Sequence, residues 1–91
     1  MSNLIEINGE NHKIAIKAGY NSLKNGTYVA FDTPFENSCL AVLLTNVAYT
    51  QNSSFTLQAV ASDSMTNEGF KFLTNISSSN NDTFYYLAIG Y

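Results

Sequence analysis

Apolar and polar residues alternate with a period of two along much of this 91-residue chain. This period places successive side chains on opposite faces of a β-strand. Residues 12–18 show it most clearly, with isoleucine and alanine on one face and two lysines on the other. A short apolar run, residues 4–7, precedes them, and Asn8-Gly9 between the two runs is a strong hairpin-turn signal. Residues 1–18 therefore predict a β-hairpin with one face in water.

Five further segments have the length and composition of strands. They span residues 27–32, 39–49, 55–62, 69–76 and 84–91. Between the first of them and the hairpin, residues 19–26 contain two glycines and predict a loop. Segment 39–49 could also be a buried helix, but it has no capping box and only strand-like neighbours, which favours a central strand. The pattern as a whole predicts an all-β fold, a small antiparallel β-sandwich of about six or seven strands in one compact domain.

Two of these segments, 39–49 and 84–91, are apolar on both faces. A strand in a lone antiparallel sandwich usually has one face in water. The excess apolar surface predicts a symmetric subunit interface, and aggregation-prone exposure is the alternative. The interface candidates are Leu40, Val42, Tyr85, Tyr86 and Tyr91. The pattern leaves open which face of 84–91 is the core; our preferred assignment places Leu87 and Ile89 there.

Charge is sparse, at 12% of residues against about a quarter in an ordinary soluble domain. The net charge of −3, four scattered lysines and the lack of arginine argue against nucleic-acid binding. No apolar run approaches the roughly 20 residues of a membrane-spanning helix, so no membrane insertion is expected. Met1-Ser2-Asn3 does not resemble a signal peptide. Assembly into a virion released by lysis would still bring the protein outside a cell.

The sequence contains no recognisable catalytic motif. His12 is the only histidine and Cys39 the only cysteine, so neither a two-histidine metal site nor a disulfide within the chain is possible. We expect Cys39 to be a buried small hydrophobe. The acidic residues are dispersed and the glycines stand singly, without the spacing of a phosphate-binding loop. We expect no enzymatic activity, no metal and no cofactor.

The remaining candidates for function are polar residues and tyrosines in or beside predicted loops. Asn and Asp side chains hydrogen-bond sugar hydroxyls, and tyrosine rings stack on pyranose rings. The candidate ligand-binding residues are Tyr20, Tyr49, Asn52, Asp63, Asn67, Glu68, Asn80, Asn81 and Asp82. Because the polar ones are common turn residues, turn formation is an alternative explanation for each of them.

Several segments resemble the C-terminal domain of bacteriophage tail-fibre and receptor-binding proteins, a family that is in turn similar to H-type lectin sandwiches. The matching segments are Val-Ala-Phe-Asp-Thr-Pro-Phe at 29–35, Cys-Leu-Ala-Val at 39–42, Gly-Phe at 69–70 and Phe-Tyr-Tyr-Leu-Ala-Ile-Gly-Tyr at 84–91. Gly19-Tyr20 and the residues up to Gly26 resemble the loop that introduces the family domain. The resemblance covers residues 19–91, after an N-terminal hairpin segment at 1–18. Two features depart from it: the sequence lacks the family's Trp-Gly strand, and it does not include the long shaft of fibre proteins, as expected of either an excised tip or a small protein in its own right.

The resemblance implies a homotrimer at the distal end of a tail fibre, in the virion and extracellular when it acts. Such a domain would contact a bacterial cell-surface polysaccharide or another host receptor without catalysis. The resemblance does not identify individual binding residues in this chain, because the loops of this family vary. The alternatives are a structural domain that trimerises and caps a fibre or baseplate, a cellular H-type lectin, and a hydrolase without a recognisable motif.

Overall fold

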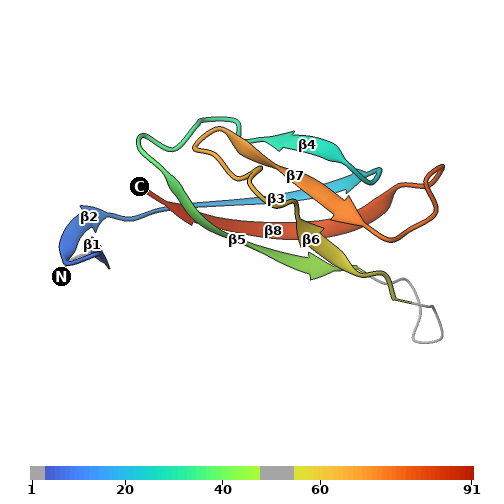
Figure 1. Ribbon diagram of the computed structural model, residues 1–91, viewed down its shortest axis with the longest axis horizontal. Helices are drawn as coiled ribbons and strands as arrows, with labels where there is room; N and C mark the ends of the chain where they lie inside the picture. Colours follow the sequence, from blue (N-terminus) through green and yellow to red (C-terminus); the bar gives the residue numbers. More distant parts are fainter. Residues whose placement is uncertain (1–3, 48–54) are drawn as a thin grey trace.

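The computed structural model describes residues 4–47 and 55–91. In this part of the chain there are eight strands in three sheets, all pairings are antiparallel, and there is no helix (Figure 1). The strands are β1 (Leu4–Ile7), β2 (Glu10–Lys13), β3 (Ala15–Leu23), β4 (Thr27–Ala30), β5 (Cys39–Asn46), β6 (Gln58–Val60), β7 (Gly69–Thr74) and β8 (Asp82–Gly90). The predicted all-β, antiparallel fold is confirmed.

Strands β1 and β2 form a two-stranded sheet of their own, beside the start of β3 (Figure 1). Asn8 and Gly9 form the turn with φ values of 52° and 87°, as a two-residue turn with both central residues left-handed requires. The His12 ring lies 4.2 Å from the Tyr91 ring, so the hairpin contacts the end of the last strand. The hairpin ends at Lys13, because residues 15–18 pair with β8 instead.

A second sheet has the order β3-β8-β5. Strand β8 is central and pairs with β3 along its whole length, from Ala15 opposite Gly90 to Leu23 opposite Asp82. The prediction of a loop at 19–26 was therefore wrong for residues 19–23, and β5 is an edge strand rather than the predicted central one. Gly19 explains the first error: a Cβ there would lie 2.3 Å from Cε2 of Tyr86, so the glycine makes room for a ring.

The third sheet has the order β4-β7-β6. Strand β6 is much shorter than the predicted strand 55–62. The residues before it make other hydrogen bonds: the Thr56 hydroxyl donates to Asp82, and the Leu57 N–H donates to the Asn75 side chain. The Leu57 carbonyl oxygen also accepts from the Asn75 backbone N–H at 3.1 Å, so the segment before β6 stays beside the sheets through both backbone and side-chain hydrogen bonds.

The core lies between the second and third sheets and is mostly aromatic. Its residues are Val29, Phe31, Phe35, Cys39, Phe70, Phe72, Phe84 and Ala88. The Phe72 and Phe84 rings stack across it, with centroids 4.0 Å apart and planes inclined by 16°. The predicted burial of Cys39 is confirmed, and Phe70 and Phe72 are fully buried. Burial also raises the pKa of the Cys39 thiol.

The inward face of β8 is the one with the smaller residues. Phe84 and Ala88 are fully buried, whereas Leu87 is 37% exposed, so the expectation that Leu87 and Ile89 form the core was wrong. The reason is close packing at Gly90, where a Cβ would lie 2.3 Å from the Ser38 carbonyl oxygen. The small residues Ala88 and Gly90 let neighbouring segments pack closely against β8 in the core, so their small size does not indicate an exposed face.

The two faces of β3 are likewise the reverse of the simplest prediction. Ile16 is 60% exposed, while Lys17, expected on the face in water, is half-buried on the inward side. The alternation itself is correct, because odd and even positions do lie on opposite faces. Periodicity gives the two faces of a strand but does not say which one meets the core.

Candidate functional site

The predicted ligand-binding residues do not form a single site. Asp63 and Glu68 lie in the loop between β6 and β7, whereas Asn80 and Asn81 lie in the turn between β7 and β8, at the other end of the sheets (Figure 1). Tyr20 lies on β3, with its ring centroid 4.7 Å from that of Tyr85. Tyr49 and Asn52 lie outside the described residues. A receptor could therefore contact only part of this set at once.

Two of the predicted residues, Asn67 and Asp63, have clear structural roles. The Asn67 side-chain N–H donates to the Phe35 carbonyl oxygen at 3.2 Å, and the Asn67 carbonyl oxygen accepts from the Phe35 N–H at 2.8 Å. These bonds join the two loops at this end. Asp63 has a φ of 62°, a left-handed conformation that aspartate tolerates better than most residues. Asp63 therefore serves to form a turn, and Asn67 serves to hold the two loops together.

Asp82 is buried at the start of β8, where it links the two large sheets. One carboxylate oxygen accepts hydrogen bonds from the Thr74 hydroxyl at 2.5 Å, the Thr56 hydroxyl at 2.6 Å and the Gln58 amide at 3.0 Å. The other accepts from the Thr83 N–H at 3.1 Å. Burial alone would raise the pKa of Asp82, but these hydrogen bonds outweigh it and lower the pKa. With its oxygens occupied in this way, Asp82 is a structural residue.

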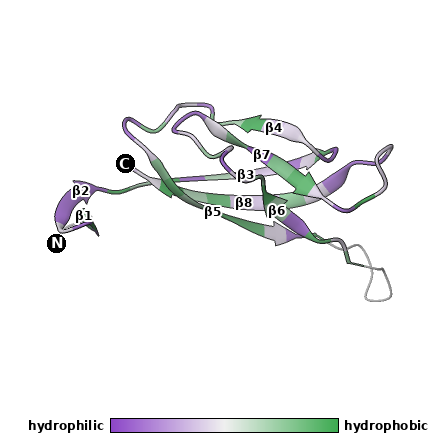
Figure 2. Ribbon diagram, in the orientation of Figure 1, coloured by the Kyte–Doolittle hydropathy of each residue, from purple (hydrophilic) through white to green (hydrophobic). Residues whose placement is uncertain are grey.

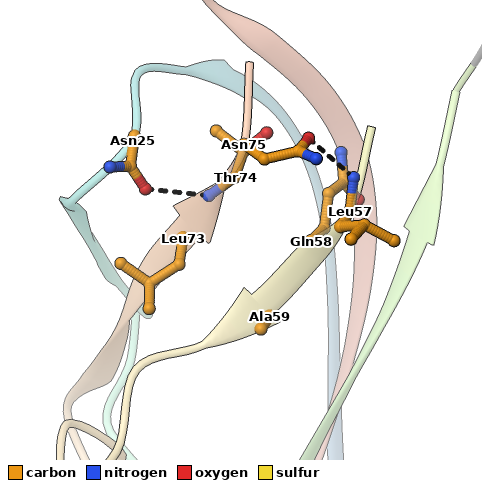
Figure 3. Close-up of a pocket in the computed structure, with 7 residues that line it drawn as sticks. All are labelled: Asn25, Leu57, Gln58, Ala59, Leu73, Thr74 and Asn75. Atoms are coloured by element: carbon orange, nitrogen blue, oxygen red, sulfur yellow. Dashed lines mark hydrogen bonds between the residues drawn. The ribbon is translucent and has the colours of Figure 1, made fainter. Parts of the chain in front are cut away.

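A surface hollow, here called the asparagine hollow, lies beside β6 and β7 (Figure 3). It has a volume of about 310 Å³ and is lined by Asn25, Leu57, Gln58, Ala59, Leu73, Thr74 and Asn75. The Asn25 side-chain oxygen accepts from the Thr74 N–H, and the Asn75 side-chain oxygen accepts from the Leu57 N–H, both at 2.9 Å. Both amide oxygens are thus occupied, and the rest of the lining is largely aliphatic.

A second hollow, smaller than the asparagine hollow and here called the edge hollow, lies beside edge strand β3 and the loop that follows edge strand β4. It has a volume of about 190 Å³ and is lined by Lys17, Ala18, Phe31, Asp32, Thr33 and Tyr86. Burial raises the pKa of Tyr86, and the nearby negative charge of Asp32 raises it further. None of the polar residues here was a ligand candidate from the sequence. The contacts that bring β3, β8 and this loop together are long-range, so no local pattern could have found them.

The outward side of the β3-β8-β5 sheet is mostly apolar and carries no charged residue, and we call it the outer apolar face. Figure 2 shows hydrophobic residues along much of β5 and β8. Its most exposed large side chains are Ile16 (60%), Leu43 (55%), Tyr20 (54%), Tyr85 (53%) and Leu87 (37%). The strand register aligns them in rows: Ile16, Ile89 and Ala41; then Ala18, Leu87 and Leu43; then Tyr20, Tyr85 and Thr45. The two-sided apolar character of the sequence therefore corresponds to one buried face and one face in water.

Only some of the predicted interface residues lie on this face. Tyr85 does, whereas Val42 and Tyr86 pack against the core. Leu40 is half-buried, and so is Tyr91, whose ring contacts His12. The outer apolar face thus includes residues that were not interface candidates from the sequence, Leu43 and Leu87 among them.

Over 4–47 and 55–91, the side chains of His, Cys, Asp and Glu form no group of three or more that could hold a metal ion. The same part of the chain has no helix with the length and hydropathy needed to cross a membrane.

Comparison with known proteins gives one match. A family model described as "Putative tail fiber protein gp53-like, C-terminal" matches residues 10–91, from the start of β2 through the whole of both large sheets. A search of the curated proteins and a search of the solved structures each gave no match. A tail fibre is a component of the virion. The matched residues include nearly the whole chain, which therefore belongs to this tail-fibre C-terminal family.

Proposed function

We propose that this domain is the non-enzymatic, receptor-binding tip of a phage tail fibre, where it recognises a bacterial surface glycan as a homotrimer. Family membership supports the assignment to a tail fibre. The single observation that supports assembly of several copies is the outer apolar face. The likeness to H-type lectins belongs to the same proposal, since a two-sheet sandwich leaves loops and sheet edges free for ligand.

The outer apolar face is suited to contact with further copies of the same chain. An antiparallel sheet that faces water on one side normally has polar residues there, but this one exposes isoleucine, leucine and tyrosine. The three rows described above contain no charged side chain, so identical copies can approach without repulsion between like charges. A subunit interface would remove this surface from water at every copy.

The mass in solution tests the assembly. We expect light scattering to give three times the 10.0 kDa of one chain. Leu43→Asp, in the middle row of the outer apolar face, should give single chains because it would place a charge in the interface. Leu57→Asp is the matched control, since Leu57 is 75% exposed beside the other sheet and should leave the trimer intact. A monomeric wild-type protein would refute the trimer.

Binding to an array of bacterial capsular polysaccharides and lipopolysaccharide O-chains tests recognition. We expect retention of one or a few polysaccharides, and loss of binding to the corresponding cells once that polysaccharide has been stripped. Equal binding before and after stripping would refute glycan recognition. A stable trimer that adsorbs to no cell or polysaccharide would instead favour the structural, fibre-capping alternative.

A further inference from the structure

We propose that the edge hollow is a sugar-binding site, in which Lys17, Asp32, Thr33 and Tyr86 hydrogen-bond the hydroxyls of one uncharged sugar residue. The inference rests on the proposed function and adds to it the place where the glycan is held. It concerns residues that line one hollow but come from three separate parts of the chain: strand β3, the loop after β4 and strand β8.

The polar groups of the edge hollow have hydrogen-bonding capacity left for a ligand. Within residues 4–47 and 55–91, the side chains of Asp32, Thr33 and Tyr86 make no hydrogen bond or ion pair. Lys17 forms no ion pair there either, and its Nζ lies 4.9 Å from the centroid of the Phe35 ring. The asparagine hollow differs, because the side-chain oxygens of its two asparagines already accept backbone N–H groups.

The position of Tyr86 is fixed by packing before any ligand arrives. Its ring lies 5.5 Å from the Phe70 ring in an edge-to-face arrangement and 6.0 Å from the Phe31 ring. On its other side the ring crosses the backbone of Gly19, where any Cβ would come within 2.9 Å of the hydroxyl oxygen. A group held in this way loses little freedom on binding, so its hydrogen bond contributes more to affinity.

The mixture of groups favours an uncharged polyol over an ion. Lys17 donates, Asp32 accepts, and the Thr33 and Tyr86 hydroxyls do both, which matches the paired donor and acceptor character of sugar hydroxyls. A phosphate or other anion would meet the Asp32 carboxylate, and a cation would meet the Lys17 ammonium. The Phe31 ring completes the lining and offers a small apolar surface to the C–H groups of a pyranose ring.

The size of the edge hollow limits what it can hold. Its volume of about 190 Å³ is below the roughly 300–1,000 Å³ of pockets for drug-sized ligands, so it accepts one sugar residue and not an oligosaccharide. A site of this size binds weakly by itself. A trimer would present three such sites to a polysaccharide with repeated sugar units. Once one site is occupied, the others lie close to further units, so the overall affinity rises without any new contact.

The test uses the full chain and the polysaccharide that the array identifies. Tyr86→Phe removes only the hydroxyl, and Asp32→Asn removes only the charge. Each should weaken binding about tenfold, the effect of losing one hydrogen bond to a charged or fixed group. The matched controls are Tyr28→Phe, on an exposed tyrosine of β4, and Glu36→Gln, an exposed acid in the same loop as Asp32, and both should bind like the wild type.

Thermal melting of each variant separates loss of binding from loss of fold. Tyr86→Phe should melt like the wild type, because its hydroxyl has no partner among the described residues. If the wild type binds a glycan and both hollow variants bind it equally well, the inference is overturned and the proposed function stands. Loss of binding in Leu57→Ser but not in Tyr86→Phe would also overturn it, in favour of the asparagine hollow. A wild type that binds no polysaccharide overturns both.

Discussion

Replacing Asp82 by asparagine keeps the size of the side chain and removes its charge. In the wild type one oxygen accepts from Thr56, Gln58 and Thr74, and the other accepts from the Thr83 N–H. Whichever way the new amide is turned, its NH₂ group faces at least one of these donors. One or more buried hydrogen bonds to a charged acceptor are therefore lost.

The expected cost follows from those contacts. A hydrogen bond to a charged group is worth about 1.5–3 kcal/mol, and the two threonine hydroxyls can rotate to recover part of the loss. We expect Asp82→Asn to lower the free energy of unfolding by about 2 kcal/mol at neutral pH. In a domain of this size that corresponds to a fall in Tm of about 8–16 °C.

Acidification provides a second measurement of the same contacts. The pKa of Asp82 in the folded protein lies below its ordinary value of 3.8. The charged form therefore stabilises the fold above the unfolded pKa, and this contribution is lost as the pH falls through the folded pKa. The wild type should lose stability below about pH 4, and its advantage over Asp82→Asn should shrink over the same range.

Urea denaturation of both proteins at a series of pH values between 7 and 2 measures this difference. Asp63→Asn is the matched control: the residue is exposed and asparagine tolerates its left-handed φ, so the change should stay within about 0.5 kcal/mol. Equal stability of Asp82→Asn and wild type at neutral pH would refute the role of this carboxylate. A stability difference that stays constant on acidification would refute the charge as its cause.

Three other substitutions test the fold. Gly19→Ala should destabilise by about 1–3 kcal/mol in thermal melting, since the new Cβ overlaps the Tyr86 ring; a gain in Tm, the usual result of removing a strand glycine, would contradict this packing. Phe84→Leu should cost about 1–3 kcal/mol in urea denaturation through lost stacking and a small cavity, whereas Phe55→Leu at a 67% exposed position should cost little. Ile89→Asp lies on the outer apolar face and should dissociate the trimer in light scattering, while circular dichroism shows a folded chain; unfolding would return Ile89 to the core.

The sequence pattern located correctly those strands whose own residues suffice to indicate a strand. The residue pattern located β4, β7 and most of β8, because each is a short segment rich in β-branched or aromatic residues and follows a turn. It failed at Gly19, which locally signals a loop. The reason for that glycine is the ring of Tyr86, far away in the sequence. It failed again at Gly90 and Ala88, where small residues accommodate the Phe35 ring and the rest of the core.

The candidate site was less predictable still, for the same physical reason. An aspartate at the end of a run of Ser and Asn suggests a solvated turn, but Asp82 accepts hydrogen bonds from residues up to 26 positions away. Lys17 belonged to the expected polar face, and Tyr86 to an expected interface. Their meeting with Asp32 in the edge hollow depends on the pairing of β3 with β8 and on the packing of the two sheets.

The central place of β8 also affects how the protein is made. Among the described residues, β3 and β5 both pair with β8 and not with each other, although β8 follows them in the sequence. During translation these two apolar strands have no partner until residues 82–90 leave the ribosome, so the sheet closes late and through long-range contacts. A chain terminated before β8 would expose two unpaired apolar edges and be lost to aggregation or proteolysis.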